Sequence, residues 1–128
     1  MAWKHKHISE AESAVMEVLW SRHPLSAEDI TAKVTEGRDW STGTVKSLLN
    51  RLLAKQAISA ERDGRRYLYS PVLARADYLS AEGRGLIDRL FGGQVSNLLT
   101  HFSRHEQLSA DDIAELKRLI GELENDDR

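Results

Sequence analysis

The spacing of apolar residues changes from helical to alternating near the middle of the chain, and this change limits the folds open to it. One stripe recurs at helical spacing: Val45, Leu48, Leu49 and Leu52. Residues 58–62 and 67–70 then alternate roughly by two, with Asp63-Gly64 between them as a hairpin signal. Pro71 ends the second strand. A two-stranded hairpin is only marginally stable alone, so we expect it to pack on the helices.

Two shorter helical patterns come before this segment. Ser9-Glu-Ala-Glu12 and Ser26-Ala-Glu-Asp29 each place a serine three residues before a carboxylate, as in a capping box at a helix start. We expect the first helix to end near His23-Pro24, because proline disfavours helical backbone at the residue before it. The second helix should stop at Gly37, and the third should begin with Ser41 as its N-cap.

Three helices followed by a hairpin are the layout of a winged helix, which is a helix-turn-helix with a two-stranded wing. The link around residues 35–40 is the expected turn. The predicted fold class is therefore mostly α with a small β hairpin. We expect a winged helix-turn-helix DNA-binding domain over residues 1–73 and a C-terminal helical dimerisation region over residues 74–128.

The C-terminal region returns to helical spacing. One segment ends at Gly92-Gly93, a short one follows, and the last starts at Ser109-Ala-Asp-Asp112 with another capping-box pattern. So few apolar residues make no independent core of useful size, and oligomerisation is a usual remedy. Packing against the winged helix of the same chain is the alternative. The residues expected at a dimer interface are Leu86, Leu90, Phe91, Leu98, Leu99, Phe102, Ile113, Leu116, Leu119 and Ile120.

The outer face of the third helix has no acidic residue, unlike an ordinary solvated helix surface. The residues expected to face DNA from this helix are Ser41, Thr42, Gly43, Thr44, Lys46, Ser47, Asn50 and Arg51. A helix in the major groove needs small or polar side chains near its N-terminus, so that its backbone can approach the base edges. Lys46 and Arg51 would bind phosphates, which adds affinity and salt dependence rather than sequence choice. Asn50 suits either an adenine or a phosphate.

The net charge of −2 hides an uneven distribution of charge. In residues 40–75 seven basic residues stand against two acidic ones, whereas acidic residues are in excess from residue 81 onward. This pattern indicates a polyanion-binding face, with an ordinary local excess on a mixed surface as the alternative. Around the hairpin turn, where a wing would follow the DNA backbone or minor groove, lie Arg62, Arg65 and Arg66. Pairing of Arg66 with Glu61 across the hairpin is the other reading of that residue.

The composition narrows the classes of function. The chain has no cysteine, which excludes disulfides, zinc–cysteine sites and thiol nucleophiles, and this fits a reducing compartment. It has no glycine-rich phosphate loop and no convincing nucleophile–base pair, so we expect neither an enzyme nor a cofactor. No apolar run approaches the roughly 18 residues of a membrane span, and the start lacks an apolar signal-peptide segment. The simplest expectation is a cytoplasmic protein.

Two other functions fit parts of the sequence. A metal sensor would use His101 and His105, whose spacing puts both imidazoles on one helix face, with His5-Lys-His7 at the other end of the chain. Zinc uptake that is lost on His101→Ala would support it. A winged helix that binds only proteins would expose apolar groups on its third helix. The polar and basic outer face of this helix favours DNA instead.

Several motifs, taken in order, resemble the penicillinase and methicillin-resistance repressors of the BlaI/MecI type. They are Ile8-Ser-Glu-Ala-Glu12, Val18-Leu-Trp20, Trp40-Ser41, Thr44-Val-Lys-Ser-Leu-Leu-Asn-Arg-Leu52, Gly64-Arg-Arg-Tyr-Leu-Tyr-Ser-Pro71 and Gln107-Leu-Ser-Ala-Asp-Asp-Ile113. Each motif is weak alone, but their order and spacing over nearly the whole chain are specific. The resemblance implies a homodimeric winged-helix repressor that binds palindromic double-stranded operator DNA.

The resemblance also implies how such a repressor is released. In the best-known members, a membrane-bound sensor of β-lactam antibiotics triggers cleavage in the dimerisation half, between an asparagine and a phenylalanine. The matching pair here is His101-Phe102, which keeps only the phenylalanine. Gly43 stands where these repressors tend to carry a lysine. Copper-responsive relatives bear a cysteine-rich C-terminal motif, which this chain lacks.

Overall fold

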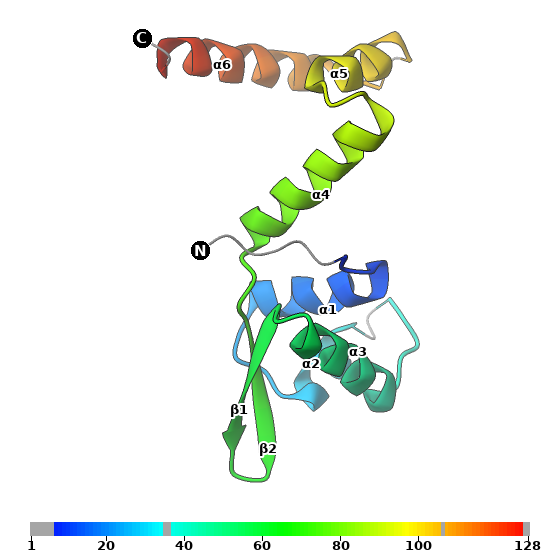
Figure 1. The fold of residues 1–128 in the computed structure, drawn as a ribbon, viewed down its shortest axis with the longest axis vertical. Coiled ribbons are helices and arrows are strands. Elements are labelled where there is room, and N and C mark those ends of the chain that lie inside the picture. The colour runs from blue at the N-terminus through cyan, green and yellow to red at the C-terminus, as the bar shows by residue number, and fades with distance from the viewer. Residues whose placement is uncertain (1–6, 35–36, 106, 127–128) are drawn as a thin grey trace. The chain divides into compact units, whose positions relative to one another are not determined.

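Residues 7–34, 37–105 and 107–126 are described by a computed structural model (Figure 1). They form six helices and one two-stranded antiparallel hairpin, in the order α1-α2-α3-β1-β2-α4-α5-α6. The predicted fold class is therefore confirmed. The chain divides into two compact units, Met1–Ala81 and Glu82–Arg128. Within the described ranges, no helix is both long enough and apolar enough to cross a membrane.

Helix α1 (Glu10–Ser21) begins with the predicted capping box. The Glu12 amide donates to Ser9 Oγ at 3.1 Å, and the Ser9 amide donates to Glu12 Oε1 at 2.9 Å. Two backbone donors that the first turn cannot satisfy by itself are thus paired. The helix ends just before His23-Pro24, as predicted.

The two elements of the helix-turn-helix are α2 (Ala27–Val34) and α3 (Thr42–Ala54). Each starts at the serine that the sequence indicates, since Ser26 Oγ accepts from the Asp29 amide and Ser41 Oγ accepts from the Thr44 amide, both at 3.2 Å. As described, α2 ends ahead of Gly37, where the sequence places its end. Residues 35–36, which include the start of the expected turn, lie outside the described part of the chain.

Strands β1 (Ile58–Asp63) and β2 (Arg66–Pro71) form the hairpin. Their register pairs Asp63 with Arg66, so the loop is Gly64-Arg65 and not the expected Asp63-Gly64. This shift by one position has a backbone reason, because Gly64 has φ 65°. A positive φ at the first of two loop residues is the place of glycine in a type II′ turn, whose twist suits a hairpin.

The hairpin packs on the helices through its base and through one further backbone pair. Leu25, in the connection between α1 and α2, donates to the Tyr69 carbonyl (3.0 Å) and accepts from the Tyr69 amide (2.8 Å). Ile58 and Leu73 are buried where the hairpin meets the helices. The expected packing of the hairpin is confirmed.

Among the described residues, the buried apolar core lies entirely in the unit Met1–Ala81. Its buried apolar residues are Ile8, Val15, Met16, Leu19, Leu25, Ala27, Ile30, Val34, Val45, Leu48, Leu49, Leu52, Ala57, Ile58 and Leu73. The predicted inner stripe of α3 is fully contained in this set. With that stripe inward, the acid-free face of α3 points away from the core.

The second unit, Glu82–Arg128, consists of helices and differs from the first in its burial. It contains the end of α4 (Arg75–Leu90), then α5 (Val95–Arg104) and α6 (Ala110–Asp126). As predicted, α4 ends just ahead of Gly92-Gly93, whose φ angles are 61° and 78°, and α6 starts with a capping box between Ser109 and Asp112 (3.0 and 3.2 Å). None of the described residues of this unit is buried.

Candidate nucleic-acid interface

The outer face of α3 is a continuous polar surface. Seven of the eight residues expected to face DNA are exposed, and Thr42 is half-buried. The exposed ones are Ser41, Gly43, Thr44, Lys46, Ser47, Asn50 and Arg51. Because the opposite stripe is held in the core, this face has one fixed orientation on the winged helix. Its formal charge is positive, since it carries Lys46 and Arg51 and no acid.

The N-terminus of α3 is capped but open to a ligand. Ser41 Oγ takes the Thr44 amide and also lies 3.2 Å from Thr44 Oγ1. Other first-turn amides of a helix have no partner within it, so an anion such as a phosphate is favoured there. A Cβ added at Gly43 would meet only Ser41 Oγ, at 3.6 Å, which is an ordinary contact. A longer side chain would therefore fit at this position, and glycine adds no charge to this end of α3.

The three wing arginines lie around the hairpin loop, and all are exposed. Arg62 donates to the Gly64 carbonyl (3.1 Å) and its guanidinium stands 5.9 Å from the centre of the Tyr67 ring. Arg66 pairs with Asp63 at 3.4 Å, and not with Glu61 as the alternative supposed. The register explains this outcome, because Asp63 is opposite Arg66 whereas Glu61 is opposite Leu68.

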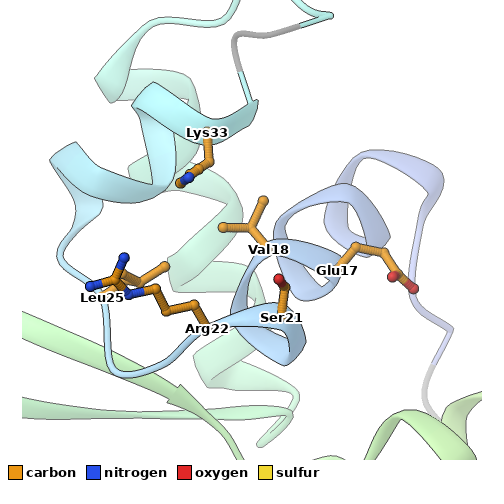
Figure 2. Close-up of a pocket in the computed structure, with 6 residues that line it drawn as sticks. All are labelled: Glu17, Val18, Ser21, Arg22, Leu25 and Lys33. Carbon is orange, nitrogen blue, oxygen red and sulfur yellow. The ribbon is translucent and has the colours of Figure 1, made fainter.

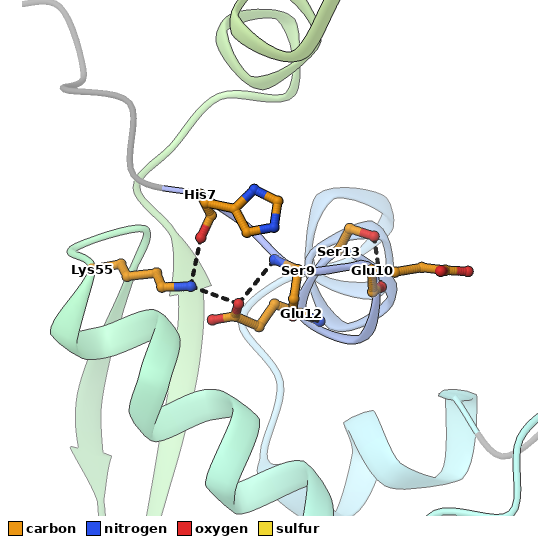
Figure 3. A network of polar contacts seen from close by, with 6 residues as sticks. All are labelled: His7, Ser9, Glu10, Glu12, Ser13 and Lys55. Carbon is orange, nitrogen blue, oxygen red and sulfur yellow. Dashed lines mark hydrogen bonds and ion pairs between the residues drawn. The ribbon is translucent and has the colours of Figure 1, made fainter. Parts of the chain in front are cut away.

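A partly buried ion pair between the C-terminal end of α3 and the start of α1 is a feature that the sequence patterns did not predict (Figure 3). Lys55, the C-cap of α3, donates to Glu12 Oε1 and to the His7 carbonyl, both at 2.6 Å. The Glu12 side chain is only 2% exposed. Burial by itself raises the pKa of Glu12, but hydrogen bonds from Lys55 and Ser9 and the charge of Lys55 outweigh it and hold that pKa below its ordinary value. The spacing of Glu12 from Met16 and Leu19 was the available signal, because it puts Glu12 on the buried side of α1.

A groove of about 450 Å³ runs beside α1 and α2 (Figure 2). The residues that line it are Glu17, Val18, Ser21, Arg22, Leu25 and Lys33. None of the described residues that line this groove belongs to the set expected to bind DNA. The groove is therefore a feature separate from the candidate interface.

The residues expected at a dimer interface are on the surface of the second unit. Leu86, Leu90, Ile113, Leu119 and Ile120 are exposed by 40% to 60%. The remaining ones are half-buried, namely Phe91, Leu98, Leu99, Phe102 and Leu116. These apolar residues are thus not buried by the rest of their own unit.

The His101-Phe102 pair lies inside α5. The His101 ring is edge-on to Phe102 (5.3 Å between centroids), stands 6.1 Å from the Phe91 ring and 4.5 Å from the His105 ring. In the described residues no three or more His, Cys, Asp or Glu side chains are grouped to hold a metal ion. His5, of the metal-sensing alternative, lies outside those residues, and the alternative stays a prediction.

Three helices, a wing and an exposed basic third helix define a winged helix-turn-helix protein of the DNA-binding class. The family model described as penicillinase repressor matches residues 8–122. The chain belongs to the penicillinase repressor family.

Curated relatives and solved structures agree with this membership. The chain is 28% identical over 122 residues to the penicillinase repressor of Bacillus licheniformis, covering 95% of each chain. It is 30% identical over 117 residues to the methicillin resistance regulatory protein MecI of Mammaliicoccus sciuri, covering 91% of this chain and 95% of that one.

Two solution structures of BlaI are similar to the first part of the chain. The DNA-binding domain of the repressor BlaI is 31% identical and covers 61% of this chain and 94% of that chain, with a TM-score of 0.53. The Bacillus licheniformis BlaI monomeric form in complex with the blaP half-operator is also 31% identical, covers 59% of this chain and 92% of that chain, and gives a TM-score of 0.51.

Proposed function

We propose that this chain is a transcriptional repressor that binds palindromic operator DNA as a homodimer, through α3 and the β1–β2 wing. The observation that carries the proposal is the exposed, acid-free face of α3, fixed outward by its buried stripe. The relative BlaI is known in complex with a half-operator, which supports DNA as the ligand of this face.

The N-terminal half of α3 would read bases in the major groove. Small and hydroxyl side chains let the backbone come close to the base edges, and they are Ser41, Thr42, Gly43, Thr44 and Ser47. Lys46 and Arg51 would neutralise phosphates on either side of the groove. Asn50 lies one turn further along and would reach either an adenine edge or a phosphate.

The wing would bind the neighbouring backbone or minor groove. Arg65 is in the loop itself, while Arg62 is held by the Gly64 carbonyl and the Tyr67 ring. Arg66 would exchange Asp63 for a phosphate. That exchange costs little, because both side chains of the pair are more than half exposed and such pairs contribute about 0–1 kcal/mol.

Dimerisation through the second unit would bring two such interfaces to one operator. The uncovered apolar residues of α4 and α6 support it, because a partner chain would remove them from water. In this proposal, residues 1–73 bind DNA and residues 74–128 form the dimerisation region. Two half-sites read together give far more specificity than one, and a repressor seated on a promoter excludes polymerase.

Release would follow from loss of the dimer. In this proposal a sensor protease cuts at or near His101-Phe102, which separates α6 from the rest without touching α3. Because that bond is inside α5, the helix must open locally before a protease can reach it. The chain itself would act in the cytoplasm, without catalysis or a cofactor.

The Arg51→Ala variant tests the interface. The probe is the duplex that the full chain selects from a random DNA library, titrated at several salt concentrations. We expect weaker binding to every duplex and a log–log salt slope that is smaller by about 1, since Arg51 neutralises a phosphate. Lys33→Ala, which removes an exposed basic residue from α2, is the matched control. An Arg51→Ala slope equal to that of Lys33→Ala and of the wild type would contradict the proposal.

A further inference from the structure

The chain leaves the wing along a path that is fixed at several atoms. The Ala57 carbonyl, just after α3, accepts from both the Val72 amide (2.9 Å) and the Leu73 amide (3.0 Å). The Leu73 side chain is 2% exposed, and its carbonyl accepts from the indole Nε1 of Trp20 at 2.8 Å. The segment that connects β2 to α4 is therefore held in place by the winged helix and is not a flexible linker.

The first turns of α4 also contact α1, through side chains. The Tyr78 ring lies 5.4 Å from the Trp20 ring, and Arg75 Nε lies 3.1 Å from Glu17 Oε1. Both contacts are within the unit Met1–Ala81. Together with the Trp20–Leu73 hydrogen bond, they hold the first turns of α4 against α1.

Two glycines lie inside the continuous helix α4, one turn or more beyond these contacts. Gly83 and Gly85 have ordinary negative φ, and a Cβ added at either would meet nothing within 4 Å. Within the described part of this chain, neither a turn nor close packing requires glycine there. Glycine is among the least favourable residues in a helix interior, after proline. The compact unit ends at Ala81, so these positions also lack support from its core.

We infer that Gly83 and Gly85 let α4 bend, and that these two residues set the range of half-site spacings that a dimer accepts. The inference rests on the proposed function, because spacing matters only to a dimer on a palindrome. One added base pair turns a half-site by about 34° around the DNA axis and moves it by about 3.4 Å. A helix that bends can follow such a change, and a stiff one cannot.

The Gly83→Ala/Gly85→Ala variant of the full chain tests the inference in solution. The chain has no native cysteine, so Ser59→Cys, at an exposed position of β1, accepts one spin label per copy. Pulsed dipolar spectroscopy then measures the distance distribution between the two labels of a dimer. We expect the distribution to narrow by about twofold in the double variant, because alanine stiffens the helix. Gly121→Ala, at an equally open helical glycine in α6, is the control and should leave the width unchanged.

DNA binding provides the second readout. The probes are the palindrome that the chain selects from a random library, the same palindrome with one base pair added or removed at its centre, and its isolated half. The wild type should bind the three full-length probes within about threefold, whereas the double variant should prefer one spacing by about tenfold. Affinity for the isolated half should change by less than about twofold.

Two results separate the failure of this inference from the failure of the proposed function. Distance distributions and spacing preferences that are equal in the wild type and the double variant would overturn the inference and leave the repressor proposal intact. A wild-type chain that gives no label–label distance, because it is monomeric, would overturn the dimer and the inference with it.

Discussion

The Glu12 carboxylate and the Lys55 ammonium lie 2.6 Å apart, and this pair joins the start of α1 to the end of α3. Lys55 is one of the basic residues of the 40–75 segment, yet the structure turns it inward to Glu12 and to the His7 carbonyl. Among the basic residues near α3, Lys55 therefore holds the helix in position, and its charge is directed toward Glu12 and not toward DNA.

Replacing Lys55 with methionine should destabilise the fold, because it leaves the Glu12 carboxylate buried without a countercharge. We expect a loss of about 2–3 kcal/mol in the free energy of unfolding, below the 3–5 kcal/mol of a fully buried pair because Lys55 is 27% exposed. Urea unfolding followed by circular dichroism measures it. Lys46→Met, at an exposed position of α3, should change stability by less than about 0.5 kcal/mol.

A double variant separates charge from packing at this pair. Glu12→Gln combined with Lys55→Met removes both charges, so it should be more stable than Lys55→Met alone. A double variant that is as unstable as the sum of its single changes would show that the two residues do not interact.

The pH dependence of stability should contain a contribution from Glu12. Its folded pKa lies below the ordinary value of 4.5, so the folded state binds the proton less well than the unfolded state does. The stabilisation is therefore complete above about pH 4.5 and is lost as the pH falls through the folded pKa. Urea titrations between pH 3 and pH 7 should show a smaller fall toward acid in Glu12→Gln than in the wild type. Parallel profiles for the two proteins would refute this assignment.

Removing the Asp63 carboxylate should strengthen DNA binding. Asp63→Asn frees Arg66 for a phosphate, and we expect about two- to fivefold tighter binding to any duplex at low salt. Folding stability should change by less than about 0.5 kcal/mol, because the pair is exposed. Fluorescence anisotropy measures the affinity. Glu61→Gln makes the same change of charge on the same strand without releasing Arg66, so its effect should be less than half as large. Equal effects would mean that overall charge, and not the Asp63–Arg66 pair, controls binding by the wing.

The sequence predicted best those features whose partners are close along the chain. The caps at Ser9, Ser41 and Ser109 each involve an amide three residues ahead, so the pattern alone locates them. The inner stripe of α3 follows from helical periodicity in the same way. The same local rules predict the outer face of α3, because this face consists of the residues opposite the buried stripe.

Contacts between distant residues could not be predicted in this way. Glu12 and Lys55 are 43 positions apart, and Trp20 and Leu73 are 53 apart, so their pairing depends on how α1 packs on the rest of the unit. The hairpin loop moved by one residue for a different reason. Asp63-Gly64 and Gly64-Arg65 both suit a hairpin, and the structure has the second, with Gly64 at φ 65° in the position that glycine takes in a type II′ turn.

The number of chains bound to one DNA duplex tests the central claim most directly. Analytical ultracentrifugation of the full chain with the palindrome that it selects, in dilute salt, should give two chains per palindrome and one per isolated half. Ile120→Glu, which puts a charge on an exposed apolar position of α6, should reduce binding to the palindrome far more than to the half. A strictly monomeric chain that binds neither duplex would contradict the account.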